Sequence, residues 1–391
     1  MQLVAYGAQD IYLTGNPQIT FFKVVYRRHT NFSMEAIEQT FNGSADFGKR
    51  VTCTVSRNGD LMHRVYLQVT VPAVTAGAGG FRWLNWLGHV LIKNVEVEIG
   101  GQRIDKHYGD WMHIWNELTQ SPGHKVGYAN MVGNVPRLTQ LTPADAKTPE
   151  VDLYIPLEFW FCRNPGLSLP LIALQYHEVK INLEFRSASE CYFGAAVSVP
   201  SLEAASLYVD YIYLDTEERR RFAQMSHEYL IDQLQFTGAE SVTTNATQSI
   251  RLNFNHPVKE LVWVFRTALN EGNNDYLNFY SAVESIVEPM VNAKVMLNGH
   301  DRASQRDASY YRLMQPWQHH SNVPLKPVYV YSFALRPEEH QPSGTCNFSR
   351  IDNATLKVTN NAIVDGSIFV FAVNYNVLRV VSGMGGLAYS N

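Results

Sequence analysis

One segment near the N-terminus of this 391-residue chain has nearly the residues needed to bind a phosphate. Gly43 to Lys49 resembles a phosphate-binding loop, but Arg50 follows where Ser or Thr must reach magnesium. Residues 51–55 then alternate like a β-strand, so no helix N-terminus is available to hold the phosphate. We therefore predict that this segment is a hairpin loop.

The 13 histidines could supply metal ligands, but their spacing does not favour a metal site. A metal-binding enzyme of the cupin class needs a close His pair on one strand face with a carboxylate nearby. The only close pair is His319-His320, whose side chains diverge in a strand and lie ~100° apart in a helix. We expect scattered histidines and no cofactor. Stoichiometric metal in the purified protein would instead support a cupin-type metalloenzyme.

Other catalytic arrangements also lack support in the sequence. The chain has no Gly-x-Ser-x-Gly elbow, and no Cys has an evident activating His. The carboxylate pairs Glu217-Glu218 and Glu338-Glu339 lie in polar segments, where we expect them to be solvated. Residues 219–221 are three arginines after two glutamates, which favours a salt-bridged linker face over a nucleic-acid patch. We predict that the protein is not an enzyme.

The overall composition excludes several classes of protein. Hydrophobic residues make up 46% and charged residues 17%, which excludes a disordered chain. Lys and Arg number 32 against 36 Asp and Glu, a net charge of −4 that argues against a protein that coats nucleic acid. The 12% aromatic content favours a β-rich fold, because rings suit a pleated, half-buried surface. The length suggests two or three domains.

The cysteines and the N-terminus bear on the compartment in which the chain folds. The four cysteines show no metal or disulfide spacing, so we expect reduced, buried thiols in a reducing compartment. The N-terminus lacks the basic start and apolar core of a secretory signal. The longest apolar stretches, such as residues 261–265, are far shorter than the ~20 residues of a membrane-spanning helix.

Alternation of apolar and polar residues predicts antiparallel strands with one wet face. Residues 179–186 place four apolar side chains opposite four polar ones. Residues 65–71, 95–99 and 356–359 follow the same pattern. Parallel strands would read as unbroken apolar runs separated by helices, so we predict an all-β protein.

The two halves of the chain repeat the same features in the same order, about 198 residues apart. Residues 95–101 and 293–299 each read as a strand ending in glycine, and a short helix is predicted about ten residues later. Residues 37–43 likewise resemble 231–238, and strands at 65–71 and 260–266 follow them. This order indicates a duplicated domain. The helical spacing of zero, three, four and seven is shared by Trp111, Ile114, Trp115 and Leu118 and by Tyr310, Leu313, Met314 and Trp317.

These patterns predict two tandem eight-stranded antiparallel jelly rolls, a double jelly roll with short helices in the loops and linker. Asp215, with Glu218 three residues later, is a plausible helix cap at the start of the linker. Residues 383–386 are predicted to be too flexible for a core. The predicted divisions are an N-terminal arm at 1–28, a first jelly roll at 29–214, a helical linker at 215–228, a second jelly roll at 229–381 and a C-terminal tail at 382–391.

The N-terminal run from Gln2 to Phe32 resembles the opening of the major capsid proteins of nucleocytoplasmic large DNA viruses, of the chlorella-virus and algal-virus type. It reads QLVAYGAQDIYLTGNPQITFFKVVYRRHTNF. Residues 56–61, 105–115 and 348–356 are also similar to that family. The resemblance extends from residue 2 to about residue 375, across both predicted domains.

The resemblance implies a homotrimer with six similar lobes, which forms a nearly hexagonal capsomer that tiles the icosahedral shell of a large double-stranded DNA virus. It implies no catalytic residue. It also implies neighbouring capsomers as partners, long loops facing outward, and synthesis and assembly in the host cytoplasm. The arm would face the particle interior, near minor capsid proteins and an internal membrane. The expected arm contacts are Phe21, Phe22, Lys23, Tyr26, Arg27 and Arg28.

Two further readings of these surfaces remain open. Residues 26–29 are basic and aromatic, a combination that can stack on single-stranded nucleic acid, although we favour docking against a protein partner and no direct contact with nucleic acid. The alternative function is a glycan-binding jelly-roll module, in which exposed aromatic residues of a paralogous minor capsomer contact host-surface glycans. The five sequons, at Asn31, Asn42, Asn245, Asn347 and Asn353, are candidate glycan sites, although without a secretory signal we expect most of them to be chance matches.

Overall fold

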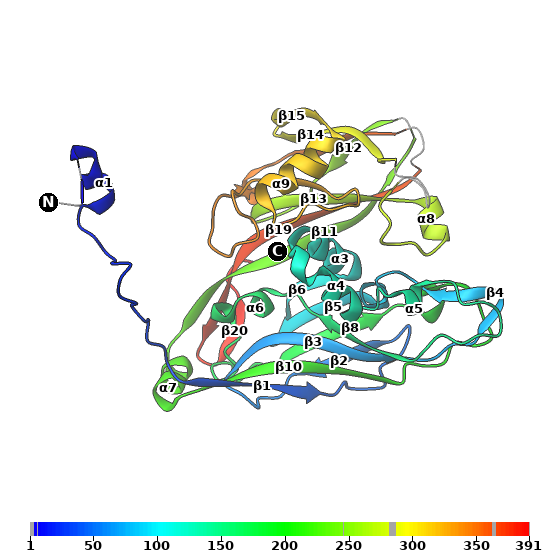
Figure 1. Cartoon of the computed structure of the whole chain (residues 1–391), viewed down its shortest axis with the longest axis horizontal. Coiled ribbons are helices and arrows are strands. Elements are labelled where there is room, and N and C mark those ends of the chain that lie inside the picture. The colour runs from blue at the N-terminus through cyan, green and yellow to red at the C-terminus, as the bar shows by residue number, and fades with distance from the viewer. Residues whose placement is uncertain (1–3, 6, 245, 281–286, 362–364, 391) are drawn as a thin grey trace.

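The first half of the chain folds into a sandwich of two four-stranded antiparallel sheets (Figure 1). The structure is a computed structural model that describes residues 4–5, 7–244, 246–280, 287–361 and 365–390. One sheet has the order β1-β10-β3-β7 and the other β2-β8-β5-β6. The bounds are β1 Phe32–Gln39, β2 Arg50–Thr54, β3 Leu61–Val71, β5 Ile92–Ile99, β6 Gln102–Tyr108, β7 Val151–Pro156, β8 Val179–Phe185 and β10 Ala204–Leu214. A separate two-stranded antiparallel sheet, formed by β4 (Ala76–Trp83) and β9 (Tyr192–Ala196), extends from this sandwich.

The second half repeats the first strand for strand. Its sheets have the orders β11-β19-β13-β16 and β12-β18-β14-β15. Each strand occupies the place of its counterpart, so the predicted duplication and the double jelly-roll fold are confirmed. The bounds are β11 His227–Val242, β12 Thr247–Arg251, β13 Pro257–Thr267, β14 Met290–Leu297, β15 His300–Asp307, β16 Tyr329–Ser332, β18 Ala354–Asn360 and β19 Gly366–Val381, with β17 (Cys346–Asn347) on β13 and β20 (Met384–Leu387) on β19.

Burial follows the predicted alternation where a strand has one wet face. In β8, the apolar residues are buried while Lys180 and Glu184 are half-exposed. Strand β13 differs because both of its faces are covered. Trp263 faces the core of the second sandwich, whereas Val262 and Val264 belong to the larger cluster that continues into the first sandwich. The two sandwiches therefore share an apolar contact.

Short helices occupy the loops, and the two predicted by apolar spacing are present. The first is α3 (Gly109–Thr119), and the second is the π-helical turn η5 (Tyr310–Met314) continued by α9 (Gln315–His319). A Cβ on Gly109 would lie 2.1 Å from the carbonyl oxygen of His89, so only glycine lets α3 begin this close to its neighbour. The other helices are α1 Ile11–Thr14, α2 Leu87–Leu91, α4 Lys125–Met131, α5 Pro136–Thr139, α6 Trp160–Arg163, α8 Ala268–Gly272 and the 3₁₀ turns η1 Ala8–Asp10, η2 Pro122–His124, η3 Pro165–Leu167, η4 Ala188–Glu190 and η6 Phe348–Arg350.

Helix α7 (Thr216–Gln224) connects the two sandwiches. The Asp215 side chain accepts hydrogen bonds from the backbone N–H groups of Glu217 and Glu218, which caps the helix. Arg219 forms an ion pair of 2.9 Å with Asp60 of the first sandwich, as expected for a salt-bridged linker face.

The segment that resembles a phosphate-binding loop is an ordinary connection between β1 and β2. Gly43 and Gly48 have φ angles of 99° and 70°, which glycine adopts without strain. Strand β2 follows at Arg50, as predicted, rather than a helix. Cys53, Cys162 and Cys191 are buried free thiols, and Cys346 is a half-buried one.

Residues 384–387 form a strand, and the expectation that 383–386 are too flexible for a core was wrong. Strand β20 pairs with β19, and Leu387 packs against the larger core cluster. Tyr176 of the first sandwich donates a backbone hydrogen bond of 2.9 Å to the carbonyl of Gly383. A Cβ on Gly385 would lie 2.7 Å from Leu174, so the glycines permit a close approach between the two sandwiches.

Within the part of the chain that the structure describes, no helix has the length and apolar character needed to cross a membrane.

Candidate functional site

The two sandwiches of the chain contact each other through ring packing, a buried ion pair and a hydrogen bond between strands. Helix α3 of the first sandwich packs on β19 of the second, where the Trp111 and Phe371 rings lie 5.4 Å apart. At the start of the helix, the Arg266 guanidinium donates a 2.7 Å bond to the Asp110 carboxylate, and both side chains are largely buried. Strand β6 joins β11 through the Asp105 carboxylate, which accepts from the Leu234 backbone N–H at 3.1 Å. These contacts hold the two lobes of one chain together.

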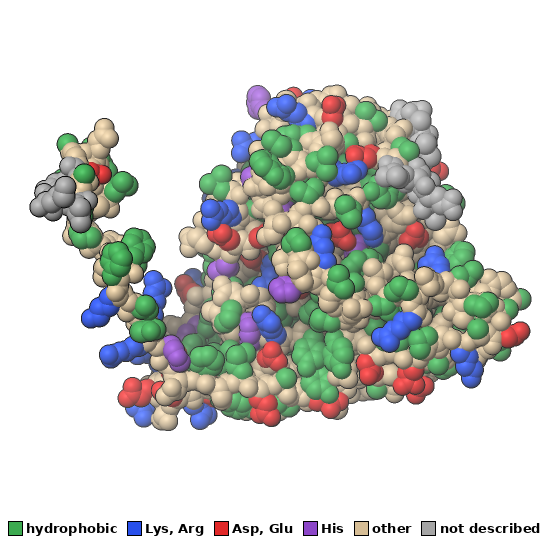
Figure 2. Space-filling model, in the orientation of Figure 1, with side chains coloured by type: hydrophobic (Ala, Val, Ile, Leu, Met, Phe, Trp, Pro, Cys, Tyr) green, Lys and Arg blue, Asp and Glu red, His purple; other side chains and the backbone are tan. Residues whose placement is uncertain are grey.

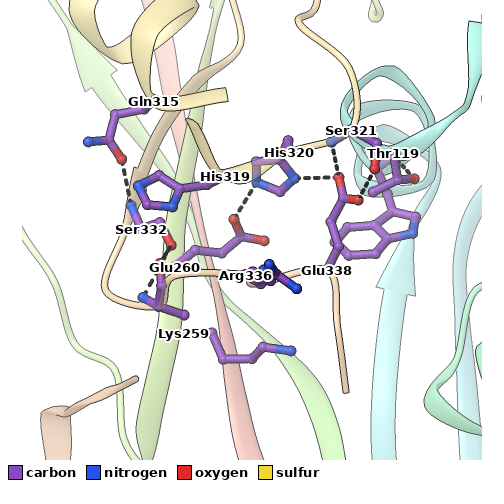
Figure 3. Close-up of polar contacts among 12 residues, drawn as sticks. Thr119, Lys259, Glu260, Gln315, His319, His320, Ser321, Ser332, Arg336 and Glu338 are labelled. Atoms are coloured by element: carbon purple, nitrogen blue, oxygen red, sulfur yellow. Dashed lines mark hydrogen bonds and ion pairs between the residues drawn. The ribbon is translucent and has the colours of Figure 1, made fainter. Parts of the chain in front are cut away.

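A buried ion cluster fixes the loop after α9 to strand β13 (Figure 3). His320 Nε2 lies 2.7 Å from a Glu260 carboxylate oxygen, and His320 Nδ1 lies 2.9 Å from a Glu338 oxygen. Burial alone would lower the pKa of His320, but the two carboxylates outweigh it and raise the pKa to about 9. Burial would raise the pKa of Glu338, but hydrogen bonds from His320 and Ser321 hold it below its usual value.

This cluster corrects one expectation from the sequence. Glu338 is not a solvated linker carboxylate, because its neighbours place it against His320. His319 and His320 diverge as expected, with His319 bonded to the Leu335 carbonyl and the His320 side chain buried in the core. The usable signal was Lys259-Glu260, a charged pair directly before the apolar run at residues 261–265 of the same strand.

A second buried polar cluster links helices of the first sandwich to a loop of the second. His89 Nε2 lies 2.7 Å from the Tyr128 hydroxyl, and Lys326 Nζ lies 3.1 Å from His113 Nε2. Burial lowers the pKa of His89 to about 3 and that of His113 well below its usual value, so both rings are neutral at pH 7. Lys326 also donates to the Leu277 carbonyl at 2.7 Å. No sequence pattern indicates this cluster, because its members are far apart in the chain.

Perturbed pKa values can mark catalytic sites, yet both clusters lie within packing contacts and each bridges separate segments. Among the described residues, no group of three or more His, Cys, Asp or Glu side chains is arranged to hold a metal ion. The arrangement supports a structural role for these charges.

The N-terminal arm extends away from the rest of the chain (Figure 1). It carries exposed hydrophobic and basic side chains along its length (Figure 2). Phe21 and Phe22 are 88% and 98% exposed, and Tyr26, Lys23, Arg27 and Arg28 are exposed too. The predicted arm residues therefore lie exposed on one extended segment, and their contacts with a partner remain a prediction.

The predicted glycosylation sites are dispersed over the chain. Asn31, Asn42, Asn347 and Asn353 are exposed, and Asn245 lies outside the described residues. Exposure makes these four accessible, and their modification remains a prediction.

Comparisons with known proteins agree with this architecture. The family model "Major capsid protein N-terminus" matches residues 20–215, and "Large eukaryotic DNA virus major capsid protein" matches residues 218–386. The major capsid protein of Pyramimonas orientalis virus is 61% identical, with 100% of this chain and 99% of the relative covered. That of Paramecium bursaria Chlorella virus 1 is 45% identical, with the same coverage.

A solved structure of the PBCV-1 protein VP54, fitted into a cryo-EM reconstruction of the virophage Sputnik, is also similar. It has a TM-score of 0.83 and 40% identity, and the match covers 95% of this chain and 100% of that chain. A second structure, from a quasi-atomic model of the PBCV-1 virus capsid, has a TM-score of 0.82 and 39% identity, covering 95% and 100%. This chain therefore belongs to the major capsid proteins of large eukaryotic DNA viruses and is a structural component of a virus capsid.

Proposed function

We propose that three copies of this chain form a nearly hexagonal capsomer that tiles an icosahedral shell, assembled in the host cytoplasm with neighbouring capsomers as its partners. The strand-for-strand equivalence of the two sandwiches carries this proposal. Two similar lobes per chain give six similar lobes around a three-fold axis, which matches the six neighbours of a position in a hexagonal layer. In this proposal, the lobes are residues 29–214 and 229–381, joined by the linker at 215–228.

The mass of the purified chain in solution tests the proposal. We expect a trimer that persists on dilution, because permanent subunit interfaces commonly bury ~2,000 Å² or more. Sedimentation over a wide concentration range, followed by negative-stain electron microscopy, should show three-fold particles with hexagonal outlines. A chain that stays monomeric at every concentration would contradict the proposal.

The arm in this proposal contacts minor capsid proteins on the inner side of the shell, close to an internal membrane. The exposed rings of Phe21, Phe22 and Tyr26 would become buried there. Lys23, Arg27 and Arg28 would favour an acidic partner. The separation of the arm from its own sandwiches supports this role.

Changing Phe21→Ser together with Phe22→Ser should leave the trimer intact and reduce incorporation into particles by at least about 10-fold, because two rings lose their buried contacts. The matched control is Tyr12→Ser with Leu13→Ser, two residues of the same arm that are similarly exposed. Incorporation would be measured as the ratio of tagged variant to wild-type chain in purified virions. Equal incorporation of both variants would exclude the proposed contact.

A further inference from the structure

The two equivalent helices of the duplicated fold differ in how far their apolar faces are covered. In the first sandwich, Ile114 and Leu118 of α3 are both 0% exposed. At the same spacing in the second sandwich, Leu313 is 44% and Trp317 is 69% exposed. Leu313, Met314 and Trp317 line a shallow groove beside Val323. We call these three residues the helix face of the second sandwich.

The first helix is covered by the other lobe of the same chain. Trp111 packs on Phe371 of β19, whose register partner on β13 is Val262. Val262 and Phe371 lie on the side of their sheet that points away from the core of the second sandwich. A helix from one lobe thus packs on the outer sheet face of the next lobe.

The equivalent outer sheet face of the first sandwich carries tyrosines. Tyr66 on β3 pairs in register with Tyr208 on β10, as Val262 does with Phe371 on the corresponding strands. The Tyr66 and Tyr208 rings are stacked 5.2 Å apart, and Tyr154 on β7 lies 6.3 Å from Tyr66 and is 39% exposed. Tyr66, Tyr154 and Met131 also line a groove of about 920 Å³. This groove has room for a bulky side chain. We call Tyr66, Tyr154 and Tyr208 the tyrosine face.

We infer that the helix face of the second sandwich packs on the tyrosine face of the first sandwich in another copy of this chain. This deepens the proposed trimer and rests on it. Within one chain, a helix of the first sandwich packs on the outer sheet face of the second sandwich. In the inferred contact, the helix face of the second sandwich packs on the outer sheet face of the first sandwich in the next copy. Because each contact joins a helix to a sheet in the same sense, six steps of about 60° close a ring of three chains.

Charges of both signs flank the two faces, with Asp307 also beside the helix face and Arg64 also beside the tyrosine face, and one pair of opposite charges can meet between copies. Arg306 is exposed next to the helix face, with its guanidinium 5.4 Å from the Tyr310 ring. Asp210 is half-exposed on the tyrosine face and lines the same groove as Tyr66. An Arg306–Asp210 contact between copies would parallel the Arg266–Asp110 pair that joins the lobes within one chain. Within the chain the acidic residue lies on the helix, whereas between copies it would lie on the sheet.

The first test is the oligomeric state of Trp317→Glu in the full chain. We expect the dissociation constant of each contact to rise at least about 30-fold, as for a central aromatic contact residue, so the variant should be largely monomeric where wild type is trimeric. Its far-UV circular dichroism should match wild type, since Trp317 is already exposed within one chain. The matched control is Val197→Glu, which alters an exposed apolar residue of the other sandwich.

The outcomes of this test separate the inference from the proposed function. A trimeric wild type with a monomeric Trp317→Glu and a trimeric control supports both. If wild type and Trp317→Glu are both trimeric, the inferred contact is wrong but the proposed trimer is retained. The same conclusion follows if Trp317→Glu and the control Val197→Glu dissociate equally. A monomeric wild type overturns the proposed function itself.

A cross-link identifies which surface receives the helix face. The double variant Trp317→Cys with Tyr154→Cys, treated with a short bis-maleimide, should give covalent species of three chains on a denaturing gel. Trp317→Cys with Val197→Cys is the control pair and should give none. The half-buried Cys346 is replaced by Ser in every variant of this experiment, and the other three native cysteines, Cys53, Cys162 and Cys191, are buried. Cross-linking only in the control pair, or in neither pair of a trimeric protein, would overturn the assignment of the tyrosine face.

Discussion

Trp111→Ala is expected to lower the free energy of unfolding by about 3–5 kcal/mol, as large-to-small substitutions of buried aromatic residues do. Trp111 is 3% exposed and lies where α3 meets β19 of the second sandwich, so its loss leaves a cavity between the lobes. Urea-induced unfolding monitored by circular dichroism would measure the change. We also expect faster proteolysis near the linker helix α7, because the lobes would separate more readily.

Trp317→Ala is the matched control for this prediction. It removes the same side chain from the equivalent helix of the second sandwich, where the ring is exposed within one chain. Measured on dissociated chains, it should change the free energy of unfolding by less than about 0.5 kcal/mol. Equal losses for the two variants would show that the covering of α3 by the second sandwich does not contribute to stability.

His320→Ala is expected to lower the free energy of unfolding by about 3–5 kcal/mol near pH 6, because the substitution leaves the fully buried Glu260 carboxylate without its cationic partner. The pKa of His320 rises from 6.5 to about 9 on folding, which corresponds to about 3 kcal/mol. This contribution is fully present below pH 6.5 and is lost as the pH rises through about 9. The pKa of Glu338 is lowered on folding, so its contribution is present above pH 4.5 and is lost as the pH falls.

The difference in unfolding free energy between wild type and His320→Ala should therefore be largest between about pH 4.5 and 6.5 and shrink towards pH 9.5. Urea unfolding at pH 5.5, 7.5 and 9.5 measures this profile. His319→Ala is the matched control, and we expect a loss below about 1 kcal/mol with no such profile, since His319 makes one exposed hydrogen bond. A loss for His320→Ala that is the same at all three pH values would show that packing, and not charge, holds this loop.

Local patterns in the chain were sufficient to predict the strands and the duplication. Alternation along 179–186 specified both the strand β8 and its buried face. The shared spacing around Trp111 and Tyr310 located both helices, because apolar residues three and four positions apart lie on one face of a helix. The resemblance of residues 2–32 to a capsid family agrees with the family models that match the two halves.

Contacts between segments distant in the chain could not be predicted in this way. The apolar spacing of Leu313, Met314 and Trp317 is that of a covered face, yet the folded chain leaves this face exposed. The glycines of residues 383–386 predict flexibility, whereas in the structure they allow a close approach to the first sandwich. The polar neighbours of Glu338 predict a solvated carboxylate, because the sequence does not show that His320 lies beside it.

The sequence alone thus determined the all-β character, the duplication, two of the loop helices and the linker helix of this protein, since strands and helices follow local periodicity and the duplication follows from the same features recurring in the same order. The tertiary structure decided which of the two equivalent helices is covered, which charges are buried and how the C-terminal strand joins the lobes. Burial and ion pairing depend on what lies across a contact, and residues such as Asp110 and Arg266, far apart in the chain, meet only once both sandwiches have folded and packed together.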